Sequence, residues 1–172
     1  MASLMESLLI VLEKESQEYE NLLELSMKKT PVIVAGSVDE LAKITDEEQN
    51  VVGNISRLDQ KREELYADIA NVINRDVKTL MLSDLITMLE QRPEEQQKLA
   101  KVYDRLTTVV HEVKRVNGQN RELIANALEM VEFDMNMLQA MKTPPETANY
   151  NKGAYNVGAQ MGADGAGFDT RQ

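Results

Sequence analysis

His111 is the only histidine in the chain and the first residue to weigh for catalysis or metal binding. His111 and Glu112 begin like the HExxH helix of zinc proteases, but Arg115 stands where the second histidine would be. A di-iron bundle would need a glutamate three residues before the histidine, and that position is Thr108. We therefore expect His111 to be structural or solvent-facing and to bind no metal.

Other motifs that carry chemistry are missing as well. The sequence has no P-loop, no Gly-rich dinucleotide turn and no nucleophile elbow. It has no cysteine, which excludes disulfides, thiolate metal sites and cysteine nucleophiles. The many carboxylates are typical of a solvated helical surface. We predict a protein that is not an enzyme and needs no cofactor, and we set a metal-dependent bundle enzyme aside.

Composition and charge limit the partners. The 172 residues carry 19 Lys and Arg against 29 Asp and Glu, a net charge of −10. This charge argues against binding nucleic acid or an anionic membrane surface, because both reward basic residues. The apolar run at residues 8–12 is too short to span a bilayer and lacks the basic flank of a secretory signal. We expect a cytoplasmic protein.

A long helix must position whatever function the chain has. Apolar positions recur from residue 99 to residue 141 at spacings of three and four, the pattern of one continuous helical stripe. A second stripe runs one position over, through Tyr103, Val110, Asn117, Ile124, Val131 and Leu138. The apolar face is wider than a two-stranded seam needs. We therefore predict a bundle helix with surface left over for a partner.

Two features of this helix allow more than one interpretation. Asn117-Gly118 could be a turn, but the stripe stays in phase across Asn120, which favours an unbroken helix with a weak, polar spot. The amide of Asn120 could fix the helix register or hydrogen-bond a visiting helix. The methionines near the end of the helix, Met130, Met135, Met137 and Met141, could form an adaptable binding surface or fill the end of a core.

The remaining elements are predicted to be helical too. Capping boxes at Ser3/Glu6 and at Ser37/Glu40 indicate the starts of two long helices. Pro31 disturbs or ends the first of them, and Gly36 breaks the pattern before the second. Residues 74–81 form a connection, a short helix spans residues 83–91, and Pro93 suits the first turn of the last helix. The expected fold is all-α: an elongated antiparallel bundle of three long helices plus one short helix.

The composition changes after residue 142. Pro144-Pro145 is followed by a Gly-rich segment, which cannot offset its ordering entropy by burial. We expect a bundle domain at residues 1–142 and a flexible tail at residues 143–172. Tyr150, Tyr155 and Phe168 are not needed for the core and are potential anchors for a partner.

Three segments resemble one family. The sequences LAKITDEE at residues 41–48, NGQNRELI at residues 117–124 and NYNKG at residues 149–153 are similar to those of the FlgN-type flagellar export chaperones. Ile55, Leu58 and Arg62 add to this resemblance, which covers most of the chain.

The resemblance implies a cytoplasmic, non-enzymatic chaperone of a type III secretion pathway, monomeric or weakly dimeric. Its clients would be the flagellar hook–filament junction proteins, which it would hold unassembled until export. The last helix of the chaperone would bind a C-terminal helical segment of the client. The candidate client-binding residues are Val116, Asn120, Leu123, Ile124, Ala127, Met130, Val131 and Met137. Tyr150 is the first candidate for docking to the cytoplasmic domain of the membrane export gate, and Tyr155 the second. The alternative is a self-associating structural coiled-coil protein.

Overall fold

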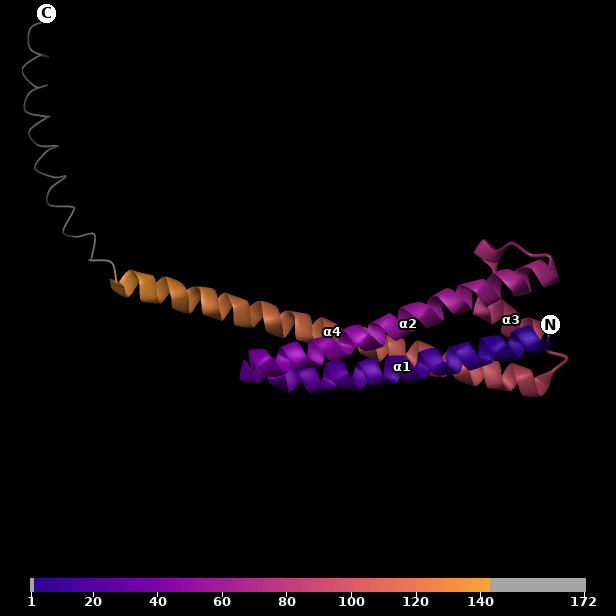
Figure 1. The fold of residues 1–172 in the computed structure, drawn as a ribbon, viewed down its shortest axis with the longest axis horizontal. Helices are drawn as coiled ribbons and strands as arrows, with labels where there is room; N and C mark the ends of the chain where they lie inside the picture. The colour runs from indigo at the N-terminus through magenta and orange to yellow at the C-terminus, as the bar shows by residue number, and fades with distance from the viewer. Residues whose placement is uncertain (1, 143–172) are drawn as a thin grey trace, which may run out of the picture. The chain divides into compact units, whose positions relative to one another are not determined.

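The computed structural model describes residues 2–142, and all of its regular elements are helical (Figure 1). In chain order these are α1 (Ala2–Ala35), α2 (Val38–Ile73), the 3₁₀ turn η1 (Val77–Thr79), α3 (Leu82–Met88) and α4 (Pro93–Lys142). No strand occurs among these residues, so the predicted all-α class is confirmed. By compactness the chain divides within α4, into Met1–Ala125 and Asn126–Gln172. The expected tail at residues 143–172 lies outside the described residues.

In the first unit, α1, α2 and α4 share one core. At one end α1 contributes Met5, Leu8 and Leu12, which pack with residues of all the other α-helices, Ile69, Leu85, Leu99 and Val102, and with Leu89 at the end of α3. Further along, Leu22 of α1, Ile55 of α2 and Val113 of α4 form a second cluster. These pairings make α1 and α4 run in the same direction, with α2 antiparallel to both, as their course in Figure 1 also shows.

The boundary between α1 and α2 is set by glycine. Gly36 has φ +69°, a left-handed conformation that residues with a Cβ adopt only at a cost. Pro31 lies inside α1, and residues 32–35 continue the helix beyond it. Ser37 is the N-cap of α2, but its side chain accepts no hydrogen bond there, so the predicted capping box is absent. Ser3 likewise lies within α1 and is not its cap.

The connection to α4 is short and ordered by local hydrogen bonds. Asn74 ends α2 in the left-handed region (φ 54°). The Asp76 carboxylate accepts a hydrogen bond from the backbone N–H of Lys78 (3.0 Å) and caps η1. The short helix is found at Leu82–Met88, which ends before the predicted residue 91. Pro93 is the first residue of α4, as predicted.

The described part of the second unit is the last stretch of α4, from Asn126 to Lys142. Every residue of this stretch is exposed. Among the described residues, no helix is both long enough and apolar enough to cross a membrane.

Candidate functional site

The N-terminal part of the apolar stripe of α4 is buried. Six of its positions are buried in the first unit: Leu99, Val102, Val109, Val113, Val116 and Asn120. Leu99 and Val102 belong to the first cluster described above and Val113 to the second, and Asn120 is hydrogen-bonded to α1. This part of the helix is one wall of the bundle.

The C-terminal part of the same stripe is exposed, although the spacing of its apolar residues does not change. Leu123 and Ile124 are half-buried, and from Asn126 onward all side chains are exposed. Eight large apolar side chains of this stretch are between 51% and 79% exposed: Leu128, Met130, Val131, Phe133, Met135, Met137, Leu138 and Met141. Large apolar patches of this kind mark interaction surfaces in many proteins.

The change from buried to exposed coincides with the end of α1. Within the first unit, Thr30 of α1 hydrogen-bonds Asn120 of α4, 90 residues further along. Since α1 ends at Ala35, it can cover only about one and a half further turns of α4. Within the first unit, α1 therefore covers the stripe only a short way past Asn120.

The predicted client-binding residues fall into three groups. Val116 and Asn120 are buried among the bundle helices. Leu123 and Ile124 are half-buried. The other four, Ala127, Met130, Val131 and Met137, are exposed in the second unit. The two predicted docking residues, Tyr150 and Tyr155, lie outside the described residues.

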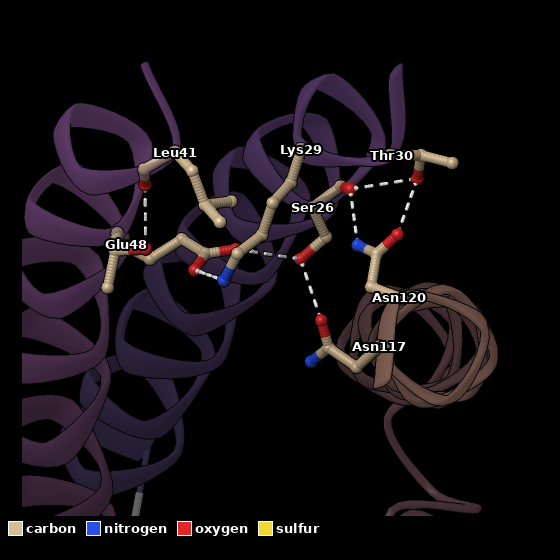
Figure 2. A network of polar contacts seen from close by, with 8 residues as sticks. Ser26, Lys29, Thr30, Leu41, Glu48, Asn117 and Asn120 are labelled. Carbon is tan, nitrogen blue, oxygen red and sulfur yellow. Dashed lines mark hydrogen bonds and ion pairs between the residues drawn. The ribbon is translucent and has the colours of Figure 1, made fainter. Parts of the chain in front are cut away.

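A polar network surrounds Asn120, where α4 meets α1 (Figure 2). The Asn120 amide donates to the backbone carbonyl of Ser26 (2.8 Å), and the Thr30 hydroxyl donates to Asn120 Oδ1 (2.7 Å). Asn120 is only 4% exposed, and its two hydrogen bonds satisfy the buried amide. α4 is unbroken here, so the predicted continuous helix through Asn117-Gly118 is confirmed. In this arrangement the amide joins α4 to α1, which is the first of the two roles considered for it.

The same network reaches α2 through Ser26. Ser26 Oγ lies 3.0 Å from Asn117 Oδ1 and 3.3 Å from Glu48 Oε1, and its one proton serves one of these acceptors at a time. Lys29 Nζ pairs with Glu48 Oε2 at 2.6 Å. The three long helices are thus held in register by polar contacts just before the stripe becomes exposed.

A shallow groove lies beside this network in the first unit. It holds about 400 Å³ and opens between α1, α2 and α4. Its lining is Leu22, Lys29, Glu48, Val52, Asn117, Asn120, Arg121 and Ile124. Ile124, one of the predicted client-binding residues, therefore borders a hollow and is not covered completely by the bundle.

His111 lies on the surface of α4 and is exposed, in agreement with the sequence analysis. Its neighbours Glu112 and Arg115 pair with each other at 2.9 Å. In the part of the chain that the structure describes, no group of three or more His, Cys, Asp or Glu side chains could hold a metal ion.

A buried charge cluster was missed by the sequence analysis. Glu15 of α1 is 2% exposed, and its Oε1 lies 3.3 Å from Arg62 Nε of α2. Arg62 also pairs with Asp59 and lies over the Tyr66 ring at 5.9 Å. Burial raises the pKa of Glu15, and Arg62 opposes this rise only in part. The position of Glu15 in the sequence could have indicated its burial, because Glu15 follows Leu8 and Leu12 at helical spacing on the apolar face of α1.

Comparison with known proteins gives a family match for this chain. Residues 1–157 match the family model described as FlgN protein. A curated relative, "Uncharacterized protein YvyG" of Bacillus subtilis (strain 168), is 26% identical over 133 residues, which is 77% of this chain and 76% of that protein. No solved structure matches the chain. The family match includes the positions of Tyr150 and Tyr155 as well as the whole of α4.

Proposed function

Because this chain belongs to the FlgN family, the family of flagellar export chaperones, we propose that it binds the C-terminal helical segment of hook–filament junction proteins. The proposed binding surface is α4 from residue 123 to residue 141. One observation carries the proposal: this stretch is helical, and its large apolar side chains are exposed.

The physical basis is helix-to-helix recognition. An amphipathic client helix buries its own apolar face against an exposed apolar face of α4, which removes both from water. Methionine side chains are flexible and polarizable, so Met130, Met137 and Met141 can adapt to clients of different shape. A client segment covered in this way cannot polymerise before export.

The proposal centres on the residues that a client can reach. Leu123, Ile124, Ala127, Met130, Val131 and Met137 are exposed or half-buried. Val116 and Asn120 are buried against α1 and α2, and a client would contact them only after displacing α1. Their proposed contribution is to hold α4 in the bundle.

We propose a separate role for the segment after α4. Tyr150, and then Tyr155, would dock to the cytoplasmic domain of the membrane export gate, which would place the chaperone in the cytoplasm. The support for this role is the NYNKG segment at residues 149–153, which lies within the family match.

The client-binding proposal is tested with Met130→Asp in the full chain. Isothermal titration calorimetry with the C-terminal segment of a junction protein should show affinity reduced at least about tenfold, because a carboxylate would be buried in an apolar contact. The control is Asn136→Asp, which is also exposed in this segment and lies on the same side of the helix as Glu129 and Glu132. Since both side chains are exposed, circular dichroism should show unchanged folding. Equal affinity of the two variants would contradict the proposal.

The docking proposal is tested by deleting residues 143–172. The truncated chain should bind the client segment as the full chain does but lose binding to the cytoplasmic domain of the export gate. Tyr150→Ala should cause most of this loss and Tyr155→Ala less. If the deletion weakened both interactions equally, the division between client binding and docking would be wrong.

The exposed stretch would also serve a self-associating coiled-coil protein, which is the second candidate. Light scattering separates the two functions. We expect the chain alone to be a monomer or a weak dimer. A stable oligomer that Met130→Asp dissociates would instead favour self-association.

A further inference from the structure

The apolar side chains of residues 126–142 cover more than one face of the helix. At 3.6 residues per turn, Met130, Met137 and Met141 lie along one line, and Phe133 lies beside this line. A second group lies on the adjacent side: Ala127, Leu128, Val131, Met135 and Leu138. Together these side chains occupy more than half of the helix circumference, whereas the stripe that packs on one neighbour is roughly 100° wide. Glu129, Glu132 and Asn136 lie on the opposite side.

In the first unit, an apolar face of this width on α4 is covered by two helices. There α4 packs against two helices at once, since Val113 shares a cluster with Leu22 of α1 and Ile55 of α2. The same two stripes continue along α4 through residues 126–142, where every side chain is exposed. Full coverage of both faces beyond residue 126 therefore requires two helices from elsewhere.

A single carboxylate interrupts the apolar surface. On the helix surface Asp134 falls between the line of Met130, Met137 and Met141 and the adjacent group that includes Leu138. Asp134 is exposed, and no ion pair found among the described residues includes it. A partner that covers both faces would bury this carboxylate.

The bundle indicates how this protein treats buried carboxylates. The buried Glu15 is paired with Arg62 of another helix, and the half-buried Glu48 is paired with Lys29 of another helix. An unpaired buried charge is strongly unfavourable, so a cation from the facing helix is the usual solution. The same requirement applies to Asp134 in a complex.

We propose that one client chain covers residues 126–142 with two helices and places a Lys or Arg side chain against Asp134. This inference rests on the proposed function and specifies the client: a helical pair with one basic residue at the seam of its apolar faces. Client selection then depends on the position of a charge as well as on apolar area.

The two faces are tested with neighbouring residues in the full chain. Met137→Asp changes one face and Leu138→Asp the other, and both side chains are exposed, so folding should not change. Titration calorimetry with the C-terminal segment of a junction protein, used as one peptide, should give one peptide per chain. Each variant should bind at least about tenfold more weakly, while the control Asn136→Asp should bind within about twofold of the wild type.

The outcomes separate this inference from the proposed function. Weakening by only one of Met137→Asp and Leu138→Asp, or a ratio of two peptides per chain, would overturn the two-helix arrangement and leave client binding intact. Absence of binding by the wild-type chain would overturn the proposed function itself.

The charge at the seam is tested with Asp134→Asn. This variant should weaken binding of the same peptide by about tenfold and reduce the dependence of affinity on salt. The control is Glu132→Gln, on the opposite side of the helix, which should change neither quantity appreciably. Equal affinity and equal salt dependence for Asp134→Asn and the wild type would show that no client cation faces Asp134.

Discussion

The two parts of α4 have the same apolar spacing and opposite surroundings. From residue 99 to residue 120 the stripe is buried by α1 and α2, and from residue 126 to residue 142 every side chain is exposed. Periodicity therefore identifies the side of a helix that will be covered but does not identify what covers it. In this protein the cover is the chain itself in the first part and, by our proposal, a client in the second.

The two parts also differ in the apolar residues they use. The buried part is rich in Val, and the exposed part carries Met130, Met135, Met137 and Met141. Branched side chains have few rotamers and specify one packing, whereas methionine adapts to several. This difference suits a permanent core on one side and an exchangeable partner on the other.

The largest contrast is expected from apolar truncation in the two parts of the helix. Leu99→Ala removes a side chain that is 2% exposed and should lower the free energy of unfolding by about 2–5 kcal/mol, through lost burial and a cavity. Met130→Ala, at a side chain 69% exposed, should change it by less than about 0.5 kcal/mol. Urea denaturation of both variants measures the difference. Similar losses would mean that residues 126–142 are also buried in the free protein.

A smaller contrast is expected from two asparagines. Asn120→Ala removes the hydrogen bonds that the Asn120 amide makes with the Ser26 carbonyl and the Thr30 hydroxyl, and should lower the free energy of unfolding by about 1–3 kcal/mol. The exposed Asn136→Ala should be neutral or slightly stabilising. Urea denaturation again gives both values. A neutral Asn120→Ala would refute the role of this amide in joining α4 to α1.

Two glycines should respond to alanine with opposite signs. Gly118 lies within α4, and an added Cβ would meet nothing within 4 Å, so Gly118→Ala should stabilise the protein by about 0.5–1 kcal/mol. Gly36 has φ +69°, so Gly36→Ala should destabilise it by about 1–2 kcal/mol despite the open space. Thermal denaturation of the two variants shows the signs directly. A destabilising Gly118→Ala would mean that α4 is not a regular helix at this point.

The most subtle contrast concerns pH. Because burial raises the pKa of Glu15, the folded protein holds this proton more tightly than the unfolded chain. The contribution of Glu15 to stability is therefore most favourable below the ordinary carboxyl pKa and is lost as the pH rises through the pKa of the folded state. The Glu15→Gln variant has no carboxyl group at this position and does not lose this stabilisation. The free energy of unfolding of the variant minus that of the wild type should therefore increase as the pH rises from about 4.5 to 8.

Urea denaturation of Glu15→Gln and of the wild type across this pH range measures the effect. If the difference between the two free energies of unfolding did not change with pH, burial would not raise the pKa of Glu15.

Much of the fold follows from local patterns that can be recognised without a structure. The spacing of apolar residues predicts the long helices, Gly36 the break between α1 and α2, and Pro93 the start of α4. Helix caps were predicted less well. Neither Ser3 nor Ser37 makes the predicted capping box, because helix starts depend on backbone geometry that neighbouring elements also influence.

The site could be predicted only in part. The stripe of α4 indicated a binding surface, but six of the eight client-binding candidates remain exposed or half-buried, while Val116 and Asn120 belong to the bundle. Glu15 was not recognised at all. Its burial depends on Arg62, which is 47 residues away in the chain and lies next to it only after folding.

What the amino-acid order alone determines is the local chemistry of α4: a helix, an apolar stripe along its whole length, a methionine-rich end and a single aspartate within that stripe. These properties arise from residues three or four positions apart, so neighbours in the chain are sufficient to produce them. Tertiary structure decides which part of the stripe is buried within the protein itself. The chain turns back at Gly36, and burial of α4 by α1 depends on contacts between residues about 90 positions apart, which no local pattern reveals.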